Sequence, residues 1–227
     1  MVVEELQNVF KLRKQKKEKI FIGSFVNNRL LDLYIKNNID IVRFDLEEFA
    51  LSHNYKDRRM VTFKQFKNLL KNINLSSNMK FAIDIPFNYL YKENQISGIV
   101  DFYVNSKADI LVMDLRDDII NIISRIIKLD IPVIVNWTND FKNEELFERN
   151  YKKIYDLLLE CTNIGVLMVI LNSFPKNHIE KVRGDINIPV ISNNKSHNAD
   201  GYYFEFFKIF DFDGYSQYIK DLILELK

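Results

Sequence analysis

The chain has 227 residues, of which 47% are hydrophobic and 13% aromatic, so it is not intrinsically disordered and can form one domain with a substantial core. Its 32 Lys and Arg and 31 Asp and Glu give a formal charge of +1. This balance argues against non-specific binding of nucleic acid and against electrostatic attachment to a membrane. The single cysteine, Cys161, excludes an intrachain disulfide and a cysteine-based zinc site.

Glycine is scarce, and the first residues carry no targeting pattern. Six glycines stand where an average chain of this length has roughly 16, which argues against a glycine-rich phosphate loop. No apolar run approaches the roughly 20 residues of a membrane span, so we expect a cytoplasmic protein. Residues 11–19 are strongly basic. We interpret them as the solvated face of a helix, the alternative being an arm that binds nucleic acid or a membrane.

Short runs of β-branched and aromatic residues alternate with longer stretches of helical period. The predicted strands are Ile20–Phe25, Ile39–Asp45, Met79–Ile85, Asp109–Asp114, Ile131–Asn136, Val166–Leu171, Ile188–Ser192 and Gly201–Phe206. The predicted helices are Asn28–Lys36, Thr62–Ile73, Ile96–Ser106, Asp117–Lys128, Asn143–Cys161, Lys176–Arg183 and Tyr215–Leu226.

This alternation predicts parallel strands joined by helical crossovers. Eight strands favour a (β/α)8 barrel, with a doubly wound open sheet as the main alternative. We expect a helical N-terminal extension over residues 1–18 and a single barrel domain over residues 19–227. The longest irregular stretch, residues 46–61, is polar and basic, and βα loops of such length often carry function.

Most of the apolar strands finish on a polar residue. Asp45, Asp84 and Asp114 end the second, third and fourth predicted strands, and in a barrel these ends converge on one mouth. Neighbouring carboxylates repel each other unless a cation lies between them, and an all-oxygen ligand set suits Mg²⁺. The alternative is that each aspartate only caps the following loop. Asn136 and Asn172 are either ligand contacts or residues that satisfy the local backbone at the start of a loop.

Several segments together resemble the ketopantoate hydroxymethyltransferase family, within the phosphoenolpyruvate mutase and isocitrate lyase group of barrels. The matching segments occur in the family's order and spacing between about Lys19 and Tyr215. They are Ile39–Asp45, Arg59–Phe63, Ala82–Phe87, Lys107–Asp114, Ile131–Val133, Ile188–Ile191 and Asp200–Gly201. The resemblance implies a barrel fold, a place in pantothenate biosynthesis and assembly into a homo-oligomer.

The resemblance also implies a site and a reaction. Aspartates matching Asp45 and Asp84 hold Mg²⁺ in the family, and the acidic residue matching Asp114 lies beside the metal. The metal binds an α-keto acid and stabilises its enolate, which then attacks methylenetetrahydrofolate. Asp45, Asp84 and Asn136 would therefore contact the substrate.

The chain departs from the family at several positions. The family's general base, a glutamate, is replaced by Asn172, its lysine by Val112, its histidine by Asn136 and its serine by Leu46. Two glycine-rich segments, after the fifth and seventh strands, are also lost. An amide cannot accept a proton at neutral pH. We therefore keep two hypotheses. The chain is either a divergent Mg²⁺-dependent enzyme with a relocated base, or a catalytically inactive paralogue that serves as a binding or assembly partner.

Overall fold

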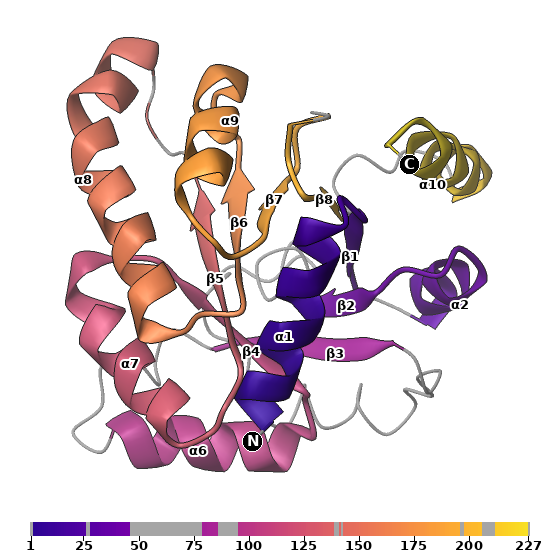
Figure 1. Cartoon of the computed structure of the whole chain (residues 1–227). Helices are drawn as coiled ribbons and strands as arrows, with labels where there is room; N and C mark the ends of the chain where they lie inside the picture. The colour runs from indigo at the N-terminus through magenta and orange to yellow at the C-terminus, as the bar shows by residue number, and fades with distance from the viewer. Residues whose placement is uncertain are drawn as a thin grey trace. The chain divides into compact units, whose positions relative to one another are not determined.

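Eight strands form a closed barrel. The computed structural model describes residues 2–25, 28–45, 79–85, 95–138, 141, 143–195, 198–205 and 212–226. Within this part of the chain the strands follow sequence order around the barrel, from β1 to β8 (Figure 1). The predicted (β/α)8 barrel is confirmed, and the open sheet is excluded.

The strands are short and mostly buried, as a sheet covered by helices requires. They are β1 (Ile20–Ser24), β2 (Ile41–Phe44), β3 (Lys80–Asp84), β4 (Ile110–Asp114), β5 (Val133–Thr138), β6 (Met168–Asn172), β7 (Val190–Ser192) and β8 (Gly201–Phe204). Each lies within two residues of a predicted strand at either end. The predicted end of β5 at Asn136 is wrong by two residues, because Trp137 and Thr138 continue the parallel pairing with β6.

The described helices are α1 (Val2–Gln15), α2 (Asn28–Lys36), α6 (Gln95–Ser106), α7 (Ile120–Lys128), α8 (Glu144–Ile164), α9 (Lys176–Asp185) and α10 (Phe212–Leu226), with a short 3-10 helix, η1 (Asp117–Ile119). The helix α8 runs three residues beyond its predicted end. It stops at Gly165, whose φ of 91° is accessible to glycine and terminates the helix. The predicted loop over residues 46–61 and the predicted helix Thr62–Ile73 lie outside the described residues.

The chain divides into two compact units. One unit consists of Phe21–Leu111 and Tyr203–Lys227. In it α2 approaches β1 closely, because the hydroxyl of Tyr34 donates a hydrogen bond to the carbonyl of Ser24 at 2.9 Å. A Cβ atom at Gly23 would lie 2.6 Å from the Tyr34 ring. Any larger residue at position 23 would therefore require the Tyr34 ring to move.

The other unit consists of Met1–Ile20 and Val112–Tyr202. Here α7 packs against β5 and α8, and α9 packs against β7 and α8. Trp137 of β5, Phe147 of α8 and Phe174 form an aromatic cluster with centroid distances from 5.1 to 6.1 Å. Edge-to-face contacts of this kind add specificity to the burial of apolar area. They fix how α8 lies on the strands of this unit.

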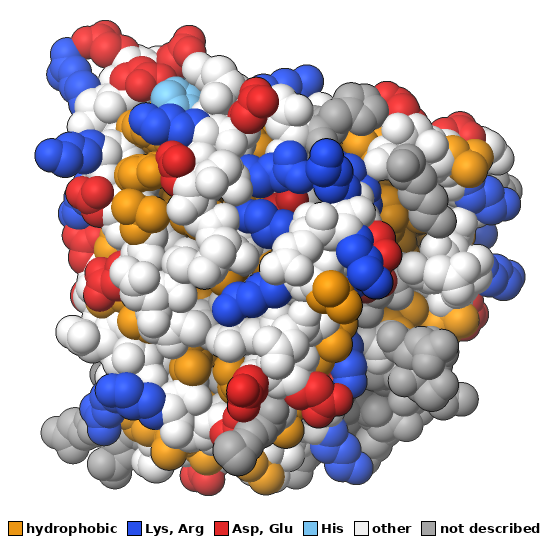
Figure 2. All heavy atoms as spheres, viewed as in Figure 1, with side chains coloured by type: hydrophobic (Ala, Val, Ile, Leu, Met, Phe, Trp, Pro, Cys, Tyr) orange, Lys and Arg blue, Asp and Glu red, His pale blue; other side chains and the backbone are white. Residues whose placement is uncertain are grey.

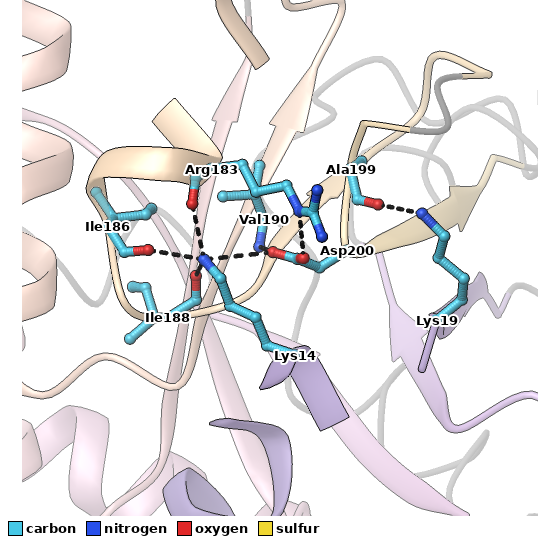
Figure 3. Close-up of polar contacts among 8 residues, drawn as sticks. All are labelled: Lys14, Lys19, Arg183, Ile186, Ile188, Val190, Ala199 and Asp200. Atoms are coloured by element: carbon cyan, nitrogen blue, oxygen red, sulfur yellow. Dashed lines mark hydrogen bonds and ion pairs between the residues drawn. The ribbon is translucent and has the colours of Figure 1, made fainter. Parts of the chain in front are cut away.

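The helix α1 is tied to the same unit at both ends. Its first amides, those of Val2 and Val3, donate to the carboxylate of Asp130. Near its other end Lys14 Nζ donates to the carbonyls of Arg183, Ile186 and Ile188 at 2.7–3.0 Å, as Figure 3 shows. Val3, Leu6 and Phe10 are buried.

Asp200, just before β8, completes this cluster. Its carboxylate accepts hydrogen bonds from Arg183 Nε and from the amide of Val190, and it lies 3.5 Å from Lys14 Nζ (Figure 3). These contacts lie at the amino ends of β7 and β8, the end of a barrel at which conserved residues serve stability rather than catalysis. The predicted boundary between an extension and the barrel at residue 18 stays a prediction.

The surface carries charges of both signs. Lys and Arg side chains are interspersed with Asp and Glu on the face drawn in Figure 2, in keeping with the small net charge. None of the described helices combines the length and the apolar character that crossing a membrane requires.

Candidate functional site

Buried polar side chains lie at the carboxyl ends of several strands, where barrels of this kind build their sites. Asp45, Asn136, Asn172 and Asn193 are each at most 7% exposed, Asp84 is half-buried and Asp114 is exposed. The contacts of these residues form two groups, one in each compact unit.

The first group centres on Arg43 of β2. Its Nε donates to Asp84 Oδ1 at 2.7 Å, and its Nη2 donates to Asp84 Oδ2 at 3.0 Å. The same Nη2 lies 3.3 Å from Asp45 Oδ2. Arg43 therefore holds one carboxylate through two parallel bonds and contacts a second, which is the geometry for which a guanidinium is suited.

Strand geometry places these three side chains together. Successive side chains of a strand point to opposite faces, so Arg43 and Asp45 share a face, as do Ala82 and Asp84. The parallel register sets Arg43 level with Ala82 of β3, whose small side chain leaves room beside it. The guanidinium can therefore extend along β3 as far as Asp84.

Tyr203 of β8 completes the first group. Its hydroxyl donates to Asp45 Oδ2 at 2.8 Å, and its ring centroid lies 5.1 Å from the guanidinium carbon of Arg43. A cation over an aromatic face is attracted by the ring, and more strongly when water is excluded. Tyr203 thus contacts both partners of the Arg43–Asp45 ion pair.

The charge of Arg43 is secured by its neighbours. Burial lowers the pKa of the guanidinium, but the attraction of Asp45 and Asp84 outweighs burial and raises the pKa well above its ordinary value. The side chain of Arg43 is only 3% exposed. A buried, permanently charged arginine therefore lies between the two aspartates.

The second group is a chain of hydrogen bonds across β4, β5 and β6, which we call the amide relay and define as Asp114, Asn136 and Asn172. Asn172 Nδ2 donates to Asn136 Oδ1, and Asn136 Nδ2 donates to Asp114 Oδ1, both at 2.9 Å. An ionised carboxylate only accepts hydrogen bonds, so Asp114 forces Asn136 to present its amino group to it. That choice turns Asn136 Oδ1 toward Asn172.

Because each amide of the relay donates toward Asp114, the last amide of the relay has a hydrogen-bond acceptor that the relay does not use. Since Asn172 donates through Nδ2, its carbonyl oxygen Oδ1 is directed elsewhere, and this buried atom has no hydrogen-bond partner in the described structure. A buried polar atom without a partner costs about 1–3 kcal/mol. Such an atom at the carboxyl end of a strand is suited to accept a hydrogen bond from a bound ligand or water.

The residue after Asn172 has an unusual backbone. Ser173 has φ of 54°, in the left-handed region of backbone conformation that residues other than glycine seldom adopt. Its amide donates to Asn193 Oδ1 at 2.7 Å, and Asn194 Nδ2 donates to the carbonyl of Phe174 at 2.7 Å. These bonds from the end of β7 hold the end of β6 in place, and backbone strain of this kind is frequent at functional sites.

The first group does not fit a magnesium ion as it stands. Mg²⁺ requires oxygen ligands at about 2.0–2.1 Å in a near-octahedral arrangement. Nη2 of Arg43 lies between oxygens of Asp45 and Asp84, where an ion bridging the two carboxylates would have to lie. No group of three or more His, Cys, Asp or Glu side chains in the described part of the chain could hold a metal ion. The magnesium site of Asp45, Asp84 and Asp114 stays a prediction.

The sequence located these residues but missed some of their partners. The structure links Asp45 and Asp84 through Arg43, and it links Asp114, Asn136 and Asn172 in the amide relay; their chemical roles stay predictions. Arg43 and Tyr203 were missed. A signal for Arg43 was present, since it is a charged residue in an apolar strand, two residues before Asp45 and so on the same face. Leu46 lies outside the described residues.

No family model matches the sequence. The chain is similar to 3-methyl-2-oxobutanoate hydroxymethyltransferase of Bacillus velezensis, with 25% identity over 137 residues, or 56% of this chain. It spans about half the length of that relative, 50%. This similarity agrees with the resemblance carried by the sequence motifs, and it is too low and too short to show membership of the family.

Several solved structures share the fold of this chain. Phosphonopyruvate hydrolase in complex with oxalate and Mg²⁺ gives a TM-score of 0.67 at 10% identity, covering 97% of this chain and 86% of that one. 2,3-Dimethylmalate lyase, a member of the PEP mutase/isocitrate lyase superfamily, gives 0.63 at 12% identity and covers 97% and 87%. Oxaloacetate acetylhydrolase, in complex with 3,3-difluorooxalacetate, gives 0.66 at 10% identity and covers 99% and 86%. Identities this low show the fold alone.

Proposed function

We propose that the chain binds a small α-keto acid or related oxyacid at the carboxyl ends of its strands and catalyses aldol-type carbon–carbon chemistry on it. The observation that carries the proposal is the amide relay, which ends in a buried acceptor, Asn172 Oδ1, that has no partner among the described residues. The names of the similar proteins support the substrate class, since they include a 3-methyl-2-oxobutanoate hydroxymethyltransferase and an oxaloacetate acetylhydrolase.

The reaction requires a base in the chain. A base removes a proton from the carbon beside the keto group, and the C–H electron pair then forms the enolate. For hydroxymethyl transfer, water first cleaves the two C–N bonds of the one-carbon unit of methylenetetrahydrofolate, which releases formaldehyde and tetrahydrofolate. The enolate carbon then bonds to the formaldehyde carbon, and the formaldehyde oxygen takes the proton from the base and becomes the new hydroxyl group. Asn172 cannot act as this base, because an amide is not protonated at neutral pH. Among the described residues at the carboxyl ends of β4 to β7, Asp114 is the carboxylate, and it is exposed. We assign it the role of base.

Hydrogen exchange tests this assignment. In D2O the wild type should exchange the C3 proton of 3-methyl-2-oxobutanoate about a hundredfold or more faster than buffer, the usual contribution of one positioned base. Asp114→Asn should return the rate, followed by proton NMR, to that of buffer. Asp101→Asn, at an exposed position of α6, is the matched control and should exchange like the wild type. Buffer-level exchange in the wild type, with and without Mg²⁺, would eliminate the enzymatic proposal.

The second candidate function is that of a catalytically inactive paralogue that binds a ligand or a partner protein. This function is favoured by Asn172, whose side-chain amide replaces the family's glutamate and donates a hydrogen bond to Asn136. Calorimetric titration with the same keto acid separates the two functions. Binding without exchange supports the inactive paralogue, and binding with exchange supports the enzyme. The predicted homo-oligomer, cytoplasmic location and role of methylenetetrahydrofolate stay predictions.

A further inference from the structure

The ion pairs of β2 and β3 carry an inference that is independent of the reaction. Two neighbouring aspartates, Asp45 buried and Asp84 half-buried, favour a positive charge between them, and in the described structure Arg43 supplies it. We propose that the guanidinium of Arg43 takes the place of a divalent cation, so that Asp45 and Asp84 act as its counter-ions and not as metal ligands.

The contacts of the carboxylates support this assignment. Asp84 uses both of its oxygens to accept hydrogen bonds from Arg43. Asp45 Oδ2 accepts from Tyr203 and lies 3.3 Å from Arg43 Nη2. For Mg²⁺ to bind, these oxygens would have to turn to the ion, and Arg43 would lose its contacts with them while remaining buried. Taking the counter-ions from a buried charge is strongly unfavourable.

The charge balance supports it as well. Two carboxylates and one Mg²⁺ sum to zero, whereas two carboxylates, one Mg²⁺ and Arg43 sum to +1 in largely buried surroundings. Like charges only a few ångströms apart repel strongly where the effective dielectric constant is low. Arg43 therefore disfavours a second cation both by position and by charge.

Removing Arg43 should create a metal site. In Arg43→Met the two carboxylates lose their cation, so 5 mM Mg²⁺ should raise the melting temperature of this variant by about 5–10 °C over EDTA, the shift for a ligand near 100 times its Kd. The wild type should show no such shift. Arg183→Met, which also removes an arginine paired with a buried aspartate, Asp200, is the matched control and should not respond to Mg²⁺.

Direct binding of Mn²⁺, followed by the loss of its free EPR signal, gives the second readout. Arg43→Met should bind one Mn²⁺ and the wild type none, also when oxalate is added to supply a compensating anion. If the wild type binds one Mn²⁺ and loses it in Asp84→Asn, the proposal is wrong. This outcome can be read even if Arg43→Met fails to fold. It is also independent of the exchange assay, so either proposal can fail alone.

Discussion

Asn136 occupies the middle of the amide relay and makes one hydrogen bond in each direction. Replacing it with leucine, which has a similar volume, would leave Asn172 Nδ2 and one oxygen of Asp114 without these partners. We expect Asn136→Leu to lower the free energy of unfolding by about 1–3 kcal/mol, the cost of unsatisfied polar groups at a buried position. Urea denaturation measures this loss.

The control for that variant lies on the same strand. Thr138 is exposed at the end of β5, and Thr138→Val should change the free energy of unfolding by no more than about 0.5 kcal/mol. Equal stability of Asn136→Leu and the wild type would show that the amide relay contributes nothing to the fold.

At the residue scale the sequence predicts which positions are polar and where each strand ends. It places Asp45, Asp84, Asp114, Asn136 and Asn172 at carboxyl ends, and the structure has them within two residues of those ends. It does not predict which of these side chains form hydrogen bonds or ion pairs with one another. That depends on the register between neighbouring strands, here Arg43 level with Ala82, and on the direction that Asp114 imposes on two amides. Register and amide orientation are properties of neighbouring strands and do not appear in any single segment.

At the scale of elements, the side chain of Lys14 holds α1 in place through more hydrogen bonds than any other side chain described for this helix. Lys14→Met would remove the donor that serves three carbonyls between α9 and β7. Asp200 would keep its bonds from Arg183 and Val190, so no uncompensated buried charge remains. Burial lowers the pKa of Lys14, although the charge of Asp200 acts in the opposite direction. The cost of burying the ammonium group therefore offsets part of the stability that its hydrogen bonds contribute.

We therefore expect Lys14→Met to cost about 2 kcal/mol, between the net value of one hydrogen bond and that of several bonds to a charged donor. Lys16, two residues further along, is exposed, and Lys16→Met should be neutral within about 0.5 kcal/mol. If Lys14 anchors α1, this helix should open locally in Lys14→Met, and its amides should exchange faster with solvent. Hydrogen exchange of the α1 amides therefore shows whether the loss of stability arises in this helix. Equal amide protection in both variants would contradict the anchoring role.

The strand ends were predicted to within two residues, and the errors at the ends of β5 and α8 have physical causes. β5 runs to Thr138 because its pairing with β6 continues past Asn136. The helix α8 passes Cys161 because nothing in the pattern stops it before Gly165, where the backbone adopts a positive φ. Hydrophobic periodicity marks the centre of an element, whereas pairing and capping set its ends.

At the scale of the whole molecule, the reactivity of the Cys161 thiol measures how often the packing around α8 opens. It is fully buried on α8, and burial, with a smaller contribution from Glu160, raises the pKa of its thiol to about 12. Only a thiolate attacks a disulfide reagent. At pH 8 we expect the native protein to react with such a reagent at least about a hundredfold more slowly than an exposed cysteine.

Glu160→Cys in a Cys161→Ala background supplies that exposed cysteine, because position 160 is exposed on the same helix. Absorbance of the released thiol follows both reactions, and denaturant should abolish the difference. Rapid reaction of Cys161 in the native protein would mean that α8 opens frequently.

The fold as a whole could be predicted because its signal is repeated: eight apolar runs separated by helical stretches admit few topologies. The chemistry could not be predicted equally well, since it rests on a few residues that occur once. Eight strands favour a closed barrel, which the structure has, whereas the proposed replacement of a metal ion by Arg43 rests on one side chain within β2.

The anchoring of α1 by Lys14 also bears on how the protein is made. Lys14 and its partner Ile188 are 174 residues apart in sequence. At about 5–20 residues per second, a ribosome needs roughly 9–35 s to travel between them. During that time Val3, Leu6 and Phe10, which are buried in the folded protein, have been synthesised, whereas Ile188 has not. The nascent chain therefore carries α1 well before this anchoring contact can form, and the apolar face of α1 must avoid other partners until then.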